Sequence, residues 1–453
     1  MNDITAFFAF LKYCLGYKEN MSRVIAGMNW HELYSFASKQ ALLGLCFEGI
    51  ERLGEEYPEE LKRNPIGREL LMTWMGKAQQ IRRQNRKVNA EAGKLFSMLR
   101  EDGLRCCILK GQGNALMYPN AYSRNPGDID VWVNASREQI TEYAKKHFEI
   151  GNDIRFQHLE TSLGGVPVEL HFFPCSMNNP LYHARLQKWF KRNADLQCSN
   201  VVSLPDGIGE IAMPTTAFNV VYQLTHLYHH FFDEGIGMRQ IIDYYVVMDD
   251  FWKVKESFSQ PSRPSLPKEG STAFPKPLSP QGTGDVTALR CSEPLRYKDG
   301  GASKPSPNCA GWDRLGMEGD SSATSCSSTA VASSSSFAVT LEVIQRDLKH
   351  LGLWKFAGAV MYVLHEALGL SEEKMIAPMD EKRGKLLLSE ILNGGNFGQH
   401  FTKYGHFTQQ GMAKKYFLKI WRNMHFVRYF PAEALCEPIF RTWHFLWRLK
   451  NKK

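Results

Sequence analysis

Two aspartates lie two residues apart within a short apolar run, Asp128-Ile129-Asp130-Val131-Trp132-Val133. Side chains alternate across a β-strand, so we expect both carboxylates on one face while Ile129, Val131 and Val133 point into a core. Two like charges on one face need a cation between them. A hard divalent ion with oxygen ligands, Mg²⁺ first and Mn²⁺ second, suits such a pair, and Mg²⁺ commonly arrives with nucleotide phosphates.

A glycine turn precedes the aspartates, and a third acid follows them. The apolar segment Ile108-Leu109 leads into Lys110-Gly111, where backbone N–H groups could hold phosphate. Downstream, Glu169 and His171 share one face of a strand in an expected hairpin that turns at Gly164-Gly165. A glycine turn, two aspartates and a later acid form an arrangement for nucleotidyl transfer. The aspartates would bind metal ions that bridge phosphates, and the third carboxylate would complete the site or take the proton of the attacking hydroxyl.

The chain resembles the uncharacterised bacterial nucleotidyltransferase family, within the polymerase-β-like superfamily, in Lys110-Gly111, Tyr118-Pro119, Arg124, Asp128-Ile129-Asp130 and Val168-Glu169-Leu170-His171. The resemblance implies a small mixed sheet flanked by helices, with Asp128, Asp130 and Glu169 as the catalytic and metal-binding acids. It also implies that Arg124 contacts phosphate. The superfamily's usual glycine-serine pair is here Lys110-Gly111, and we expect Lys110 to act as the phosphate cation in place of the serine.

The implied reaction moves a nucleoside monophosphate from an NTP to a hydroxyl and releases pyrophosphate, with Mg²⁺ or Mn²⁺ as cofactor. The acceptor is open between a small molecule, a protein side chain and an RNA end. A catalytically inactive nucleotide-binding or scaffold protein is the first alternative. A sugar-nucleotide glycosyltransferase, which also holds a metal with Asp-x-Asp, is the second; it would need a nucleotide-binding α/β region before the motif, where this chain offers helices.

Other polar residues are weaker candidates. His226, His229 and His230 have helical spacing that could bind metal, although histidines satisfied within an apolar helix are more common. Arg239 and Asp243 form an i,i+4 pair, which usually indicates a salt bridge on a helix. We expect His171, His226, Arg239 and Asp243 to support the site from behind the three acids.

The elements that position these residues predict an α+β fold, with a small mixed β-sheet nucleotidyltransferase core between N-terminal and C-terminal helical regions. We expect a helical region over 1–100, the core with its following helices over 101–256, a disordered Ser/Pro/Gly-rich insertion or linker over 257–337, and a basic helical region over 338–453.

Period and capping signals predict the individual elements. These are a long helix over Leu70–Arg100 ended by Asp102-Gly103, a strand over Arg105–Leu109, a helix over Ser136–His147, hairpin arms over Ile154–Leu159 and Val166–Phe173, and helix over Thr215–Phe258. Nowhere do eighteen apolar residues run together, so we expect no membrane span.

Composition bounds the setting of the protein. The chain has 453 residues, of which 43% are hydrophobic, and a formal net charge of +8, which suits anionic partners. Its ten cysteines include no C-x-x-C pair, and its first residues lack a basic leader, which together predict a cytoplasmic protein with reduced thiols. The basic, aromatic run over 414–422 could hold single-stranded nucleic acid, but an ordinary amphipathic helix is the favoured interpretation.

Overall fold

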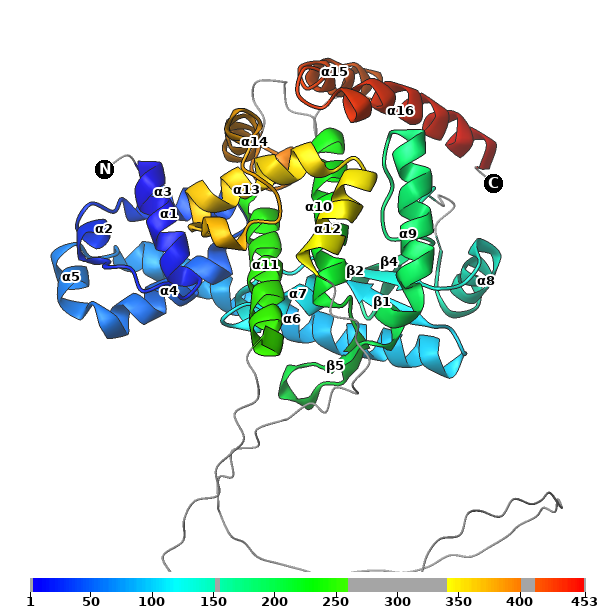
Figure 1. Cartoon of the computed structure of the whole chain (residues 1–453). Coiled ribbons are helices and arrows are strands. Elements are labelled where there is room, and N and C mark those ends of the chain that lie inside the picture. The colour runs from blue at the N-terminus through cyan, green and yellow to red at the C-terminus, as the bar shows by residue number, and fades with distance from the viewer. Residues whose placement is uncertain (1–2, 151–154, 260–339, 401–411, 452–453) are drawn as a thin grey trace, which may run out of the picture. The chain divides into compact units, whose positions relative to one another are not determined.

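The computed structural model describes residues 3–150, 155–259, 340–400 and 412–451. Residues 1–260 and 338–453 form one compact unit. Within it, helices surround a small mixed sheet, so the predicted α+β class is confirmed (Figure 1). The predicted disordered segment, 257–337, lies outside the described residues apart from the last three positions of one helix.

The N-terminal part is helical, as predicted. Its helices are α1 (Asp3–Cys14), α2 (Ser22–Ala26), α3 (Trp30–Lys39), α4 (Leu43–Glu56), α5 (Pro58–Arg63) and α6 (Arg68–Glu101). Helix α6 ends where the sequence predicts, because Gly103 adopts a positive φ of 76° that stops the helix without a Cβ clash. Trp74 ties α6 to α4, since its buried indole Nε1 donates to the carbonyl oxygen of Leu43 at 2.9 Å.

The central sheet has four strands in the order β1-β2-β4-β3. They are β1 (Cys106–Leu109), β2 (Ile129–Val133), β3 (His158–Leu163) and β4 (Val166–His171). Strands β1 and β2 are antiparallel, β2 and β4 are parallel, and β4 and β3 form an antiparallel hairpin. The register pairs Asp130 with Glu169, so two carboxylates lie side by side on adjacent strands.

The first arm of the hairpin differs from the prediction. We expected it over Ile154–Leu159, but the strand covers His158–Leu163. Gly164 and Gly165 both have positive φ angles, 56° and 74°, so they form a two-residue turn of the type that hairpins favour. Such a turn requires the residue before it to pair with the residue after it, and this extends the first arm as far as Leu163.

The two faces of the sheet have different surroundings. Ile108, Val131 and Val168 lie on one face, in a buried cluster with Leu95 and Phe96 of α6. The opposite face carries Asp130, Glu169 and His171 as well as the buried Trp132, whose ring stacks on Phe218 with centroids 6.1 Å apart. The alternation expected for the aspartate strand is therefore confirmed, with its apolar side chains in the core.

The helices that accompany the sheet are α7 (Gly111–Ala115), α8 (Arg137–His147), α9 (Pro180–Ser199), α10 (Thr216–Asp233) and α11 (Met238–Ser259). Helix α8 begins at a capping box in which Ser136 and Gln139 hydrogen-bond each other's backbone. A two-stranded ribbon, β5 (Val201–Ser203) and β6 (Glu210–Ala212), joins α9 to α10. Short 3₁₀ turns complete the connections, namely η1 (Ala121–Ser123), η2 (Pro205–Gly207), η3 (Glu372–Lys374) and η4 (Asn396–Gly398).

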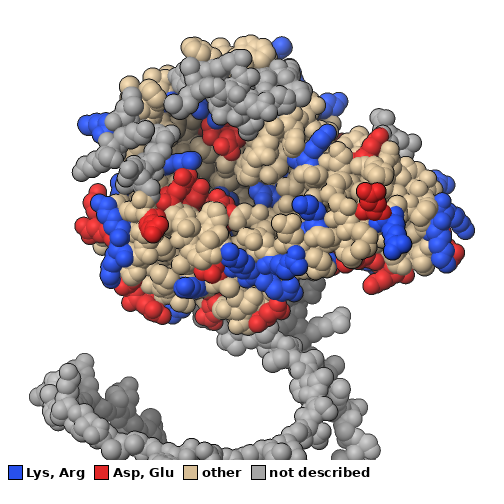
Figure 2. Space-filling view, turned by 180° about the vertical axis from the view of Figure 1, so that it is seen from behind, with Lys and Arg blue, Asp and Glu red and all other residues tan. Residues whose placement is uncertain are grey.

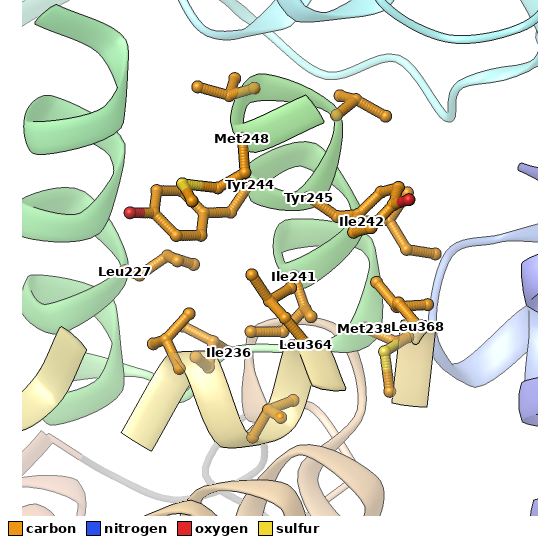
Figure 3. Packing of buried hydrophobic residues seen from close by; sticks show 14 of the residues in the cluster. Leu227, Ile236, Met238, Ile241, Ile242, Tyr244, Tyr245, Met248, Leu364 and Leu368 are labelled. Atoms are coloured by element: carbon orange, nitrogen blue, oxygen red, sulfur yellow. The ribbon is translucent and has the colours of Figure 1, made fainter. Parts of the chain in front are cut away.

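The predicted helical segment over Thr215–Phe258 is divided into α10 and α11. Gly235, with φ of 103°, turns the chain between them. The two helices pack side by side, and Leu227, Ile236, Ile241 and Leu364 meet in the buried cluster between them and α13 (Figure 3). The break therefore returns α11 along α10 and leaves both helices beside the polar face of the sheet.

The C-terminal part is again helical. Its helices are α12 (Leu341–His350), α13 (Trp354–Leu368), α14 (Glu381–Gly394), α15 (Met412–Met424) and α16 (Pro431–Asn451). Basic side chains of this part make ion pairs within the protein: Lys419 and Arg441 lie 3.0 and 2.9 Å from Asp233 Oδ1. Nucleic-acid binding by this region stays a prediction. Among the described residues, no helix combines the length and apolarity that crossing a membrane requires.

Candidate active site

The turn after β1 directs a lysine toward the sheet. Lys110 has φ 53° and ψ −124°, a region that residues other than glycine rarely adopt and that costs on the order of 1–3 kcal/mol. Its ammonium lies 3.0 Å from Asp130 Oδ2 and 2.8 Å from His226 Nε2. A strained backbone that delivers a buried cation to a cleft is a common feature of functional sites.

Three carboxylates border the same cleft, which has a volume of about 330 Å³ and is also lined by Lys110. Asp130 and Glu169 face it from adjacent parallel strands, and Asp128 lies just before β2. Acidic and basic side chains gather around a hollow in the space-filling view (Figure 2). The structure thus brings together the three acids that the sequence singled out, because the register of β2 and β4 sets Asp130 beside Glu169.

Internal cations neutralise part of this acid cluster. His171 Nε2 lies 3.0 Å from Asp130 Oδ1 and 3.1 Å from Glu169 Oε2. Burial alone would lower the pKa of His171, but its hydrogen bonds to the two carboxylates raise that pKa to about 9. The pKa of Asp130 is lowered despite its burial, because Lys110 and His171 favour the ionised carboxylate. Burial would raise the pKa of Glu169, but the hydrogen bond to His171 and the charge of that imidazolium together lower it.

Asp128 is the member of the cluster with the least compensation. It is exposed, and the nearby Asp130 carboxylate, aided by desolvation, raises the pKa of Asp128 to about 6. Within the described part of the chain, the cations in contact with these acids are Lys110 and His171, which leaves negative charge for a further cation. Carboxylate oxygens are the ligands that Mg²⁺ and Mn²⁺ prefer, so Asp128, Asp130 and Glu169 fit a divalent ion.

Arg124 belongs to a second buried cluster in the wall of the same cleft. Its Nε and Nη2 donate to Asp243 Oδ1 and Oδ2 at 2.7 and 2.8 Å, and the Tyr118 hydroxyl donates to Oδ1 at 2.7 Å. The i,i+4 salt bridge expected between Arg239 and Asp243 is therefore replaced by an Arg124 pair, because the guanidinium fork fits both carboxylate oxygens. A phosphate contact by Arg124 stays a prediction.

Arg239 lines the cleft as Arg124 does, but its partners differ. Its Nη1 donates to the carbonyl oxygen of Asn125 at 3.3 Å. Its Nε is buried and has no hydrogen-bond partner within the described residues. Burial and the neighbouring Arg124 lower the pKa of Arg239, as expected for a guanidinium that lacks a carboxylate of its own. An anionic ligand in the cleft would supply that partner.

The histidines of α10 contact one another and Lys110. His226 Nε2 lies 3.0 Å from His230 Nε2, and burial together with Lys110 holds the pKa of His226 well below its usual value. Among the described residues, the histidine and acid atoms close enough to share one ion are those of His158, Glu169 and His171, all within 4.8 Å of one another. The histidines whose atoms could share an ion with an acid therefore come from the hairpin, whereas His226 contacts Lys110.

Sequence reasoning did not identify His158. It is the register partner of His171 and is 9% exposed, with Nδ1 at 3.2 Å from Glu169 Oε2. Burial lowers the pKa of His158 to about 4, so its imidazole is neutral. A signal was present in the sequence: once Gly164-Gly165 is taken as a two-residue turn, counting outward pairs residue 171 with residue 158.

The fold and the cleft define an α+β protein whose small mixed sheet presents a carboxylate cluster, with cations at one end, to a polar cleft. A family model described as "Uncharacterised nucleotidyltransferase" matches residues 26–257, and the chain belongs to this family. Membership confirms the resemblance seen in the motifs, supports a general nucleotidyltransferase role and implies an NTP substrate. No curated protein and no solved structure matches the chain.

Proposed function

We propose that the protein is a metal-dependent nucleotidyltransferase that moves a nucleoside monophosphate from an NTP to a hydroxyl and releases pyrophosphate. The observation that carries this proposal is the pairing of Asp130 with Glu169 across β2 and β4, with Asp128 beside them at the same cleft. Structural salt bridges balance their charges locally, whereas this cluster retains an excess of acid.

Each side chain has a role that follows from its position. Asp128, Asp130 and Glu169 would hold Mg²⁺ or Mn²⁺, which neutralises phosphate charge and orients the leaving pyrophosphate when bound. Lys110 and Arg239 would donate to the leaving phosphates, a role supported by their place in the lining of the cleft. The Lys110 ammonium can pass from Asp130 to a phosphate oxygen, since a metal ion would take over neutralisation of Asp130.

An inactive nucleotide-binding protein is the second candidate, and one contact favours it. Lys110 and His171 already neutralise Asp130 at 3.0 Å each. If these contacts outlast metal addition, the cleft would hold a nucleotide without turning it over. The two candidates differ in transfer and not in nucleotide binding.

The position of a radiolabel in the NTP separates the candidates. We would incubate the protein with Mn²⁺ and a panel of acceptors (a small polyol, a protein extract and an RNA oligonucleotide), using NTPs labelled at the α- or the γ-phosphate. The proposal expects acceptor labelling from the α-label only. Asp128→Asn with Asp130→Asn should abolish it, whereas the exposed Asp195→Asn should not.

Labelling from the γ-phosphate would contradict nucleotidyl transfer, and full labelling by the double variant would show that the metal site is wrong. Nucleotide binding without any acceptor labelling across the panel would favour the inactive protein.

A further inference from the structure

A second pocket adjoins the active-site cleft on its hairpin side. It has a volume of about 150 Å³, and its walls include Phe156, Phe440 and Glu437. It shares His158 and His229, among other residues, with the active-site cleft, so the two spaces are continuous. Helix α16 supplies one wall, and the rings of Phe156 and Phe440 lie 6.2 Å apart.

The order of strands places this pocket opposite the phosphate donors. Lys110 follows β1 at one edge of the sheet, the acids lie on the two middle strands, and His158 begins β3 at the other edge. In nucleotidyl transfer the entering and leaving oxygens lie roughly in line across the phosphorus. Pyrophosphate leaving toward Lys110 therefore requires the attacking hydroxyl to arrive from the side of His158.

Buried polar groups aimed at the pocket lack partners within the described residues. Glu437 is 1% exposed; its Oε1 accepts from Arg441, while its Oε2 has no hydrogen bond. Nε2 of His158 and Nδ1 of His229 are also without a hydrogen bond. A buried acceptor without a partner costs about 1–3 kcal/mol, so the pocket favours a ligand that brings hydrogen-bond donors.

The cations around the pocket are already paired with acids. Arg155 Nη2 lies 2.6 Å from Glu160 Oε1, and Arg441 contacts both Asp233 and Glu437. An acceptor carrying phosphate groups would bring negative charge to a pocket whose open group is a carboxylate oxygen. A neutral or cationic acceptor meets no such penalty.

We infer that this pocket is the acceptor site and that it takes a small ring compound carrying hydroxyl or amine donors, such as a sugar or an amino sugar. This inference rests on the proposed function. The ring would contact Phe156 and Phe440 with its apolar face and donate to Glu437. One of its hydroxyl oxygens would bond to the α-phosphorus while the bond from phosphorus to pyrophosphate breaks, and the hydroxyl proton is released to solvent.

Binding can be measured without nucleotide or metal, which keeps this inference separate from the proposed function. We would titrate glucose, glucosamine and myo-inositol against the full chain and follow saturation-transfer NMR. At least one probe should bind, and Phe156→Ala and Glu437→Gln should each weaken it fivefold or more. The exposed Asp195→Asn should bind it as the wild type does. Thermal melts would confirm that both pocket variants fold, and Glu437→Gln preserves side-chain size if Phe156→Ala does not fold.

Several outcomes would overturn the inference. One is the absence of binding by all three probes, and another is equal affinity in the wild type and both pocket variants. A third is displacement of a bound probe by adenosine, which would show that the pocket binds the nucleobase. Tighter binding by a 5′-phosphorylated RNA trinucleotide would overturn it too. Acceptor labelling that persists in both pocket variants would reject this pocket and leave the proposed function intact.

Discussion

Arg124 and Asp130 are both buried beside the cleft, 5% and 7% exposed, but their surroundings differ. In the Arg124 cluster, the guanidinium and the Tyr118 hydroxyl donate hydrogen bonds to both carboxylate oxygens of Asp243. Around Asp130, three acids share Lys110 and His171, and the like charges raise the pKa of Asp128 to about 6. The first cluster is complete without a ligand, while the second becomes electrostatically balanced only when a cation is added.

This difference separates a structural role from a functional one. A complete buried pair is strongly destabilised by loss of one partner, because the other charge is left buried and uncompensated. A cluster with excess acid loses little stability when one acid is neutralised, but it loses its affinity for cations. Variants in the two clusters should therefore change different measurable quantities.

Breaking the Arg124 cluster should give the largest effect. Arg124→Met leaves Asp243 buried beside Tyr118, and we expect a loss of about 3–5 kcal/mol in the free energy of unfolding. Urea denaturation would measure it. The double variant Arg124→Met with Asp243→Asn should recover part of the loss, because no uncompensated charge remains.

The same double variant tests the phosphate contact predicted for Arg124. Recovery of stability without recovery of NTP affinity would support that contact. An unfolding free energy unchanged by Arg124→Met would show that the cluster is not a structural pair.

The matching change in the acid cluster should alter catalysis and leave stability almost intact. Asp128→Asn removes a proposed metal ligand that would stabilise charge in the transition state, and we expect a loss of about 10²–10³-fold in the rate of label transfer. The folded state should be as stable as the wild type or more stable at pH 7.5, because a raised pKa means that the ionised Asp128 opposes folding there. Initial rates and thermal melts measured together would check both parts, and a large loss of stability would contradict the comparison.

The two clusters also differ in how far the sequence could reveal them. Alternation around Asp128 and Asp130 and the Gly164-Gly165 turn are local patterns, so strand faces and the three acids were predictable. The Arg124–Asp243 pair joins residues 119 positions apart, and no local period reports such a contact. Helical spacing instead predicted that Asp243 would pair with Arg239 on its own helix. In the structure Asp243 pairs with Arg124 from a distant part of the chain.

Other differences have the same origin. Helix α9 and the β5–β6 ribbon carry no strong period, and their packing against the core decides their structure. His158 lies at the site because the hairpin register pairs it with His171. The prediction placed the first arm of that hairpin too early in the sequence, over Ile154–Leu159. Lys110 was predicted as a phosphate cation, but its strained backbone and its contact with His226 depend on the folded chain.

Arg239 offers a smaller, intermediate test of the cleft. Its Nε has no partner within the described residues, so Arg239→Met should disturb folding little while removing the proposed donor to the nucleotide phosphates. Losing a hydrogen bond to a charged group corresponds to about 1.5–3 kcal/mol, or roughly 10–150-fold in NTP affinity. Isothermal titration calorimetry with a non-hydrolysable NTP would measure this loss of affinity. Arg105→Met, at an exposed arginine just before β1, is a matched control.

The smallest expected effect is the pH dependence of metal binding. The proposed divalent ion would bind the ionised Asp128, whose pKa is about 6 in the metal-free protein, so Mn²⁺ affinity should fall about tenfold between pH 7 and pH 5. Mn²⁺ electron paramagnetic resonance titrations would measure the change. Asp128→Asn should bind Mn²⁺ more weakly and lose this part of the pH dependence.

The stability of the metal-free protein should follow the opposite sign over the same range. The pKa of Asp128 is raised by folding, so its favourable contribution is present below pH 4 and is lost as pH rises through 6. Saturating Mn²⁺ should reverse this trend, because the ionised carboxylate then has a cation. A metal-bound protein that still lost stability between pH 4 and 6, by the same amount as the metal-free form, would show that Asp128 does not contact the ion.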